Sequence, residues 1–151
     1  MMVLTTITGI TFVASPAPAL AACTTNGCTG LDPQVQGCTG ARTMPDPIWY
    51  TSGDLIYSVQ LRQSPVCQSM WARLVVDYNA DPLRTMYVRV QRQLYNNQQL
   101  EWQASGDYTA PIGIRTGTTW TDMVADYASG DRARACIRFG TGGSWSCTSW
   151  Q

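Results

Sequence analysis

The 151-residue sequence contains no histidine and no lysine, and its single glutamate is Glu101. Without an imidazole the chain cannot form Ser-His-Asp or Cys-His nucleophile systems, and the common zinc sites lose their usual nitrogen ligand. Without lysine it can form neither a Schiff base nor the lysine contact of a P-loop. The chemistry that remains is a pair of carboxylates, and the aspartates show no spacing that indicates one. We therefore predict no catalytic residue, no cofactor and no metal ion.

An excess of charge of either sign is also absent. Ten basic residues, all of them arginine, balance ten acidic residues, so the formal net charge is zero. Such a chain has no long-range field that attracts nucleic acid or an anionic membrane, and we expect no nucleic-acid partner. The absence of lysine, whose codons are rich in A and T, is typical of a GC-rich genome.

The first 22 residues carry no charged side chain and are typical of a secretory signal peptide. The apolar run over residues 3–14 is too short to span a membrane, which takes about 20 residues as a helix. An A-x-A site follows at residues 19–21, although no Lys or Arg precedes the run. A buried N-terminal strand is the alternative. We predict a signal peptide over residues 1–22 and one secreted domain over residues 23–151, without a transmembrane segment.

Six cysteines follow this segment, and the first of them has two interpretations. Leu20-Ala21-Ala22-Cys23 fits the lipobox of bacterial lipoproteins, in which the cysteine thiol carries a lipid. An even number of cysteines in a secreted chain indicates a disulfide framework instead, and lipidation of Cys23 would leave one thiol without a partner. We expect Cys23 to form a disulfide; a lipoprotein anchored through Cys23 is the alternative.

Behind the first cysteines, apolar and polar residues alternate with the period of β-strands. Leu55, Tyr57, Val59 and Leu61 share one face of a predicted strand, and similar patterns cover residues 71–78, 85–95 and 132–139. The segment 119–129 fits either a strand or a short helix. The sequence thus predicts an all-β fold, a small antiparallel β-barrel or sandwich, which is stapled by disulfides and begins with an extended cysteine-rich segment.

One disulfide follows from hairpin geometry. The "GTGG" turn at residues 140–143 separates the last two predicted strands, and its glycines suit a tight turn. Closing the hairpin within this turn sets Cys136 opposite Cys147, within reach of a disulfide. The other cysteines allow three connectivities, which the sequence does not separate. They are Cys23, Cys28, Cys38 and Cys67.

The segment from Gly27 to Cys38, "GCTGLDPQVQGC", has two cysteines around a turn that Asp32-Pro33 presets. A calcium loop is the functional alternative. Calcium takes six to eight oxygen ligands, and a single carboxylate in the segment supplies too few. We interpret the segment as a disulfide-stapled loop.

This segment and two later ones resemble an uncharacterised secreted domain family of actinobacteria. The later segments are "VQLRQSPVCQSMWARL" at residues 59–74 and "TDMVADYASGDRARAC" at residues 121–136. The shared pattern is G-C-x-G-x-D-P followed by G-C, and then S-P-x-C-x-x-x-W-A-R. The resemblance covers most of the chain after the signal peptide and implies an extracytoplasmic, disulfide-bonded domain. In some relatives this domain is joined to a membrane helix and a DNA-binding regulator. The family has no assigned activity.

Aromatic residues suggest a binding surface, since the chain has six tryptophans and seven tyrosines. Exposed rings beside amide groups are a common means of binding sugars. Trp71 and Trp120 fit a β core. For Arg73 we favour a pair with an internal aspartate over contact with a partner. The aromatic residues with weaker core patterning are the predicted binding candidates: Trp49, Tyr50, Trp102 and Trp150.

The sequence therefore favours a secreted, non-catalytic binding module whose partner is an extracellular protein or a cell-wall polysaccharide. One alternative is a secreted serine-proteinase inhibitor that presents Arg115 on the loop at residues 111–119, because inhibitors bind through rigid exposed loops. Another alternative is a hydrolase that uses two aspartate carboxylates.

Overall fold

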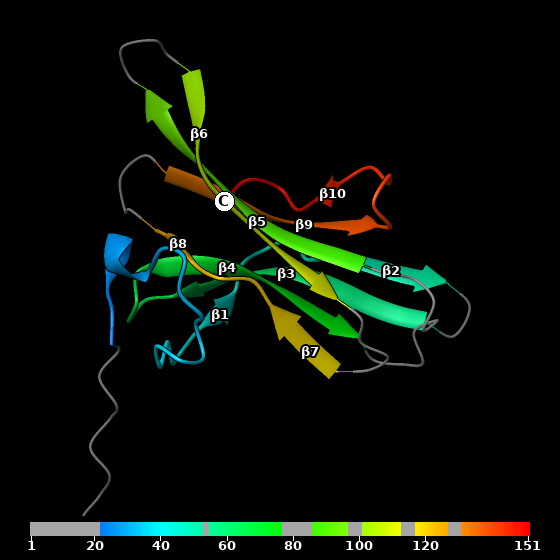
Figure 1. Ribbon diagram of the computed structural model, residues 1–151, viewed down its shortest axis with the longest axis horizontal. Helices are drawn as coiled ribbons and strands as arrows, with labels where there is room; N and C mark the ends of the chain where they lie inside the picture. Colours follow the sequence, from blue (N-terminus) through cyan, green and yellow to red (C-terminus); the bar gives the residue numbers. More distant parts are fainter. Residues whose placement is uncertain (1–21, 53–54, 77–85, 97–100, 113–116, 127–130) are drawn as a thin grey trace, which may run out of the picture.

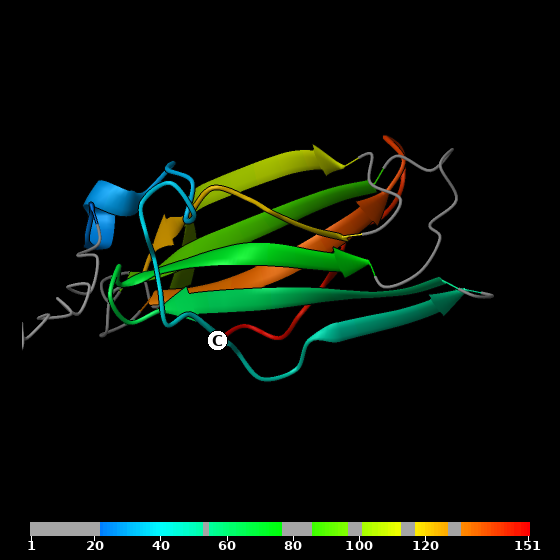
Figure 2. The same cartoon turned by 90° about the horizontal axis from the view of Figure 1, so that it is seen from below.

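The structure is a computed structural model that describes residues 22–52, 55–76, 86–96, 101–112, 117–126 and 131–151. Two antiparallel β-sheets pack face to face, and Figures 1 and 2 show the two layers. The predicted all-β, disulfide-stapled fold is confirmed. Of the two predicted architectures it is the sandwich, because the sheets formed by the described strands do not close into a barrel.

Sheet A is built on one hairpin, in which β3 (Leu55–Ser64) pairs with β4 (Ser69–Val76). Two short strands lie on the free edge of β3, and two others lie on the free edge of β4. The first two are β1 (Arg42–Thr43) and β2 (Ile48–Ser52), and the second two are β7 (Gly117–Trp120) and β8 (Val124–Ala125). The segment 119–129, which the sequence left between strand and helix, thus supplies strand residues to β7 and β8.

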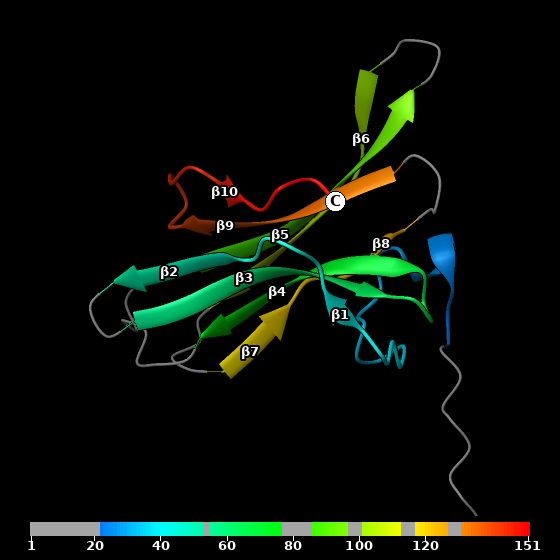
Figure 3. The same cartoon turned by 180° about the vertical axis from the view of Figure 1, so that it is seen from behind.

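Sheet B has the strand order β10-β9-β5-β6. These strands are β5 (Met86–Asn96), β6 (Glu101–Ile112), β9 (Asp131–Phe139) and β10 (Ser146–Cys147). A register shift between Arg92 and Gln93 interrupts the pairing of β5 with β6. Beyond it, the ends of β5 and β6 project past the other strands (Figures 1 and 3).

The main core fills the space between the sheets. Alternate residues of each strand point into it, as the pattern of period two predicts. Each fully buried aliphatic side chain contributes about 1.5–3 kcal/mol of burial free energy. The largest fully buried members from sheet A are Val59, Leu61, Leu74 and Val124, and those from sheet B are Val88, Val90 and Ile137.

A second, smaller core lies where the N-terminal segment meets sheet A. This segment contains the 3-10 helix η1 (Thr25–Cys28), at the end of the sheet that carries β8 (Figure 3). Trp71 and Met123 pack there against the N-terminal disulfides. Backbone hydrogen bonds fix the segment further, including one of 2.8 Å from the Thr25 N–H to the Cys67 carbonyl. In the ranges that the structure describes, no helix has the length and apolarity to cross a membrane.

Candidate functional site

Three disulfides link the described cysteines, and one of them is the predicted Cys136–Cys147 bond. The register places Cys147 directly opposite Cys136 on β10 and β9, as the turn geometry indicates. The four remaining cysteines form the pairs Cys23–Cys28 and Cys38–Cys67. Cys23 is therefore engaged in a disulfide. The Cys38–Cys67 bond spans 29 residues and ties the N-terminal segment to the turn between β3 and β4.

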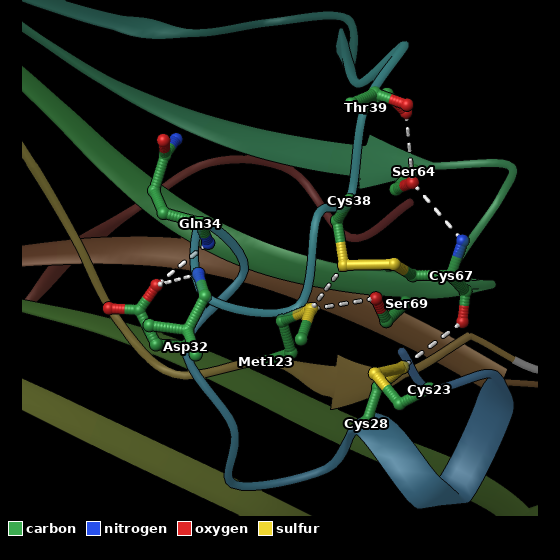
Figure 4. Close-up of a disulfide and its surroundings, with 11 residues drawn as sticks. Cys23, Cys28, Asp32, Gln34, Cys38, Thr39, Ser64, Cys67, Ser69 and Met123 are labelled. Carbon is green, nitrogen blue, oxygen red and sulfur yellow. Dashed lines mark hydrogen bonds between the residues drawn. A yellow bond between two sulfur atoms is a disulfide. The ribbon is translucent and has the colours of Figure 1, made fainter. Parts of the chain in front are cut away.

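The two N-terminal disulfides lie side by side, with their four Sγ atoms within 4.8 Å of one another (Figure 4). Four thiolates at such spacing would be the donor set of a structural zinc site. As disulfides, the sulfurs present no thiolate to a metal. Met123 packs against them, with its Sδ 3.4 Å from the Sγ of Cys38, and accepts a hydrogen bond of 3.0 Å from the Ser69 hydroxyl. In the oxidised chain this cluster therefore serves as a crosslink.

An open, polar cavity of about 310 Å³ lies between the N-terminal segment and the outer face of sheet A. Ligand-binding pockets in proteins commonly have volumes of about 300–1,000 Å³. Cross-strand pairing of Arg62 with Trp71, and of Arg73 with Trp120, forms the floor of the cavity. We call this cavity the Arg62–Arg73 pocket. Its lining residues are Gln34, Cys38, Gly40, Ala41, Arg62, Trp71, Arg73, Thr118 and Trp120.

Hydrogen bonds hold both guanidinium groups of the floor. Arg62 donates from Nη1 to the Thr43 hydroxyl and from Nη2 to the Ala41 carbonyl. Arg73 donates from Nε and Nη2 to Oε1 of Gln60, at 3.0 and 2.6 Å. A guanidinium has five N–H donors, so each arginine keeps three that these bonds do not use. For Arg73 the unused donors are the two N–H groups of Nη1 and one of Nη2, at the end of the side chain.

The N-terminal segment forms the wall of the pocket, and Asp32 shapes this wall. Its Oδ1 accepts the backbone N–H groups of Gln34 and Val35, at 2.7 and 3.1 Å (Figure 4). Its Oδ2 accepts the indole N–H of Trp120 at 3.1 Å. The Asp32-Pro33 turn predicted from the sequence is thus present, and its carboxylate joins the wall to the floor.

The Cys38–Cys67 disulfide holds the other end of the wall. Beside it, the Ser64 hydroxyl donates to the Thr39 carbonyl at 3.3 Å and accepts the Cys67 N–H at 3.2 Å (Figure 4). One covalent bond and one hydrogen bond therefore fix the N-terminal segment against the β3–β4 hairpin at this point, and the second hydrogen bond closes the turn of the hairpin itself.

The pocket is electropositive. Its lining has two guanidinium groups and no carboxylate, imidazole or free thiol. Burial, followed by the positive charge of Arg73, lowers the pKa of Arg62. Arg62 stays protonated at neutral pH, because the pKa of an arginine begins far above that range. The arrangement is suited to holding an anionic group and has no nucleophile–base pair in its lining.

The outer face of sheet B also carries arginines, but they lie over aromatic rings. We call this surface the arginine–aromatic face. Guanidinium groups at 4.0–4.8 Å from ring centres are within the range of cation–π attraction. The contacts are Arg89 and Arg138 over Trp145, and Arg132 and Arg134 over Trp150.

Cross-strand amides support the same face. Arg132 donates to Oε1 of Gln93 at 3.1 and 2.8 Å, and Arg134 donates to Oε1 of Gln91 at 2.9 Å. Burial, and then the charges of Arg89 and Arg132, lower the pKa of Arg134. On this face, arginines of like charge therefore lie close together and against aromatic rings.

The predicted aromatic candidates do not meet in one place. Trp49 lies on β2 with 59% of its surface exposed. Tyr50 is half-buried instead: its ring stacks on Tyr57 at 5.0 Å and meets Phe139 edge to face at 6.0 Å. Tyr50 thus packs partly against the main core, and its role in binding stays a prediction. Trp150 lies beneath Arg132 and Arg134 of sheet B.

The structure does not describe the side chains of two further candidates. Trp102 belongs to β6 and pairs with Tyr95 in the backbone register, but its side chain is not among those described. Arg115 lies between the described ranges, so the inhibitor hypothesis stays a prediction.

The hydrolase hypothesis requires two carboxylates that face a common cleft. Asp126 and Asp131 line one cavity, which has no room for a water molecule. Asp131 pairs with Arg92 at 2.5 Å, and Asp126 accepts a hydrogen bond from Nε2 of Gln63. These two carboxylates therefore hold structure and give the hydrolase no support.

The sequence assigned other roles to three residues of the pocket floor, Trp71, Arg73 and Trp120. Trp71 is 5% exposed and packs in the second core, yet it also lines the pocket beside the half-buried Trp120. The expected pairing of Arg73 with an aspartate is wrong, because the register places Gln60 opposite it. Applying hairpin pairing to the turn at residues 65–68 would have revealed the Arg62–Trp71 pair.

Comparisons of this chain with protein families, with curated proteins and with solved structures find no match.

Proposed function

We propose that this protein is an extracytoplasmic, non-catalytic binding module that holds its ligand in the Arg62–Arg73 pocket. The observation that carries the proposal is the pocket itself: a polar cavity of about 310 Å³ in which two anchored guanidinium groups keep unused donors. A few well-placed polar groups on a rigid frame are typical of ligand sites. Here the floor is a β-hairpin and the wall is held by a disulfide.

Three disulfides support the extracytoplasmic location, because such bonds persist in oxidising compartments. The resemblance to secreted actinobacterial domains supports it as well. The two motifs that carry the resemblance meet at the pocket, where Cys38 of the first is bonded to Cys67 of the second. Trp71 and Arg73, from the second motif, lie in the floor.

An affinity capture tests this proposal. The oxidised protein is immobilised and exposed separately to purified cell wall and to culture supernatant, and the bound material is identified by sugar analysis and mass spectrometry. The Arg62→Gln/Arg73→Gln double variant tests the pocket, and Arg134→Gln removes a charge from the other sheet as a control. We expect the wild type and the control to retain one ligand class that the double variant loses. Equal retention by all three would exclude the pocket, and no retention by any would contradict the binding function.

A further inference from the structure

The chemistry of the Arg62–Arg73 pocket narrows the class of ligand, in a step that rests on the proposed function. We propose that the pocket binds an acidic saccharide, with the carboxylate or phosphate oxyanion of the sugar on the guanidinium groups of Arg62 and Arg73. The rest of the sugar ring lies against the polar wall and Trp120.

Charge favours the anionic group. Two positive side chains line the pocket without a carboxylate among the lining residues, so an anionic group would find opposite charges there that a neutral ligand would not use. Guanidinium groups match oxyanions because two parallel N–H groups can donate to two oxygens at once. The side of Arg73 that includes Nε is taken by Gln60, which leaves its Nη1–Nη2 end for such a contact.

Both guanidinium groups are positioned before any ligand arrives. Thr43 and the Ala41 carbonyl hold Arg62, while Gln60, itself bonded to the Ser58 hydroxyl at 3.0 Å, holds Arg73. Preorganised groups lose little conformational entropy when a ligand binds. The two arginines can therefore act as a fixed receptor for an oxyanion.

The other lining groups suit a sugar ring. The exposed Gln34 amide and Thr118 hydroxyl offer both hydrogen-bond donors and acceptors, which match sugar hydroxyls. Trp120 is half-buried, and its indole N–H is already bonded to Asp32. What the ring adds to the pocket is therefore apolar surface, which suits the C–H face of a sugar.

An acidic peptide is the rival ligand, and the position of the pocket disfavours two common ways of binding one. Extended peptides commonly bind by adding a strand to the edge of a sheet, and helices bind in apolar grooves. The Arg62–Arg73 pocket lies on a sheet face, and β7 and β8 cover the adjacent edge of β4. Its lining is mainly polar, without the apolar groove that an amphipathic helix needs.

Isothermal titration tests the inference with three matched probes: a galacturonic acid oligomer, galactose 6-phosphate and a neutral galactose oligomer. We expect an acidic probe to bind and the neutral oligomer to bind at least tenfold more weakly. Arg73→Gln should weaken acidic binding about tenfold or more, since a charged hydrogen bond of this kind is worth at least about one decade in Kd. Arg73→Lys keeps the positive charge but lacks the paired N–H groups of the guanidinium. Its Kd for the acidic probe should lie between those of the wild type and Arg73→Gln. Arg134→Gln should leave the Kd within about twofold, and near-UV circular dichroism checks that every variant is folded.

The outcomes separate this inference from the proposed function. Wall material that is captured through the pocket but is not displaced by either acidic probe would overturn the acidic saccharide and leave the binding module standing. Displacement by poly-glutamate at lower concentration than by the acidic sugars would overturn it in favour of a protein ligand. Acidic binding that Arg73→Gln does not weaken would also overturn it. Binding by the carboxylate probe alone, or by the phosphate probe alone, supports the inference and identifies the oxyanion.

Discussion

The outer faces of the two sheets use arginine in different ways, although both hold some of their guanidinium groups with glutamine oxygens. On sheet A, Arg62 and Arg73 donate to oxygen atoms and face a cavity. On sheet B, arginines lie over the rings of Trp145 and Trp150. The difference shows that the neighbour of a guanidinium decides its role. Oxygen acceptors fix the group and leave some of its donors available, whereas an aromatic ring covers its flat face.

The position of Nε makes this contrast concrete. In Arg73, as in Arg132 and Arg134 of sheet B, this nitrogen donates to a glutamine oxygen. In Arg138, which lies 4.7 Å from the ring centres of both Tyr87 and Trp145, Nε is buried and finds no acceptor in the described part of the chain. This contrast is why the proposed ligand site lies on the face of sheet A, and why we expect the arginine–aromatic face to stabilise the fold.

The largest expected effect comes from the disulfide behind the pocket. Cys38→Ala/Cys67→Ala opens a loop of 29 residues and should lower the free energy of unfolding by about 3.5 kcal/mol, as loop-closure entropy predicts. It should also abolish ligand binding, since the wall loses its covalent attachment. Chemical denaturation and titration with the captured ligand measure the two effects.

The matched control is Cys136→Ala/Cys147→Ala on sheet B. Its loop spans 11 residues, so the expected loss is about 3 kcal/mol, close to that of the first pair. Ligand affinity should be kept under conditions in which both variants are folded. If the two double variants lose affinity equally, the wall is not what distinguishes the two faces.

After the two disulfide variants, Asp32→Ala should have the next largest effect. The substitution removes the acceptor for two backbone N–H groups and for the indole N–H of Trp120, and it should cost about 2 kcal/mol of stability. The affinity for ligand should fall as well, because wall and floor separate. Asp122→Ala removes the same charge from an exposed position and should change neither quantity. A normal affinity in Asp32→Ala would show that the turn does not shape the pocket.

Trp145→Ala tests the other side of the comparison. The ring lies against Arg89 and Arg138, and its loss should lower the free energy of unfolding by about 1 kcal/mol through two cation–π contacts. We expect no change in ligand affinity. A clear loss of affinity in this folded variant would move part of the binding function to sheet B.

The smallest effect is expected for Trp49→Ala. With 59% of its surface exposed, this side chain has little burial to lose, and stability should change by less than about 0.5 kcal/mol. Fluorescence quenching by the captured polysaccharide measures whether the ring also binds. Loss of affinity in this variant would restore Trp49 as a binding residue beyond the pocket.

Local sequence patterns predicted the structural features that depend on residues close to one another in the sequence. Alternation predicted the buried faces of β3, β5 and β9, because side chains of a strand alternate strictly between two faces. A short glycine turn fixed the register that joins Cys136 to Cys147. The contacts of Tyr50 with Tyr57 and Phe139 were not predicted in this way, because they depend on how the strands and sheets pack.

The pocket could not be predicted in the same way, because three distant segments build it. Gln34 comes from the wall, Arg62 and Arg73 from the central hairpin, and Trp120 from β7. Only the hairpin part follows from local pairing. The position of the wall depends on the Cys38–Cys67 bond, and the sequence allows three connectivities for these cysteines.

The same bond has a consequence for when the protein becomes active. Synthesis in a reducing compartment yields Cys38 and Cys67 as thiols, and the chain then lacks the fixed wall of the pocket. The bond forms only when the pair gives up two electrons and two protons to an oxidant. If the protein is exported as proposed, the pocket would be completed during maturation, and a reduced precursor would not compete for the ligand.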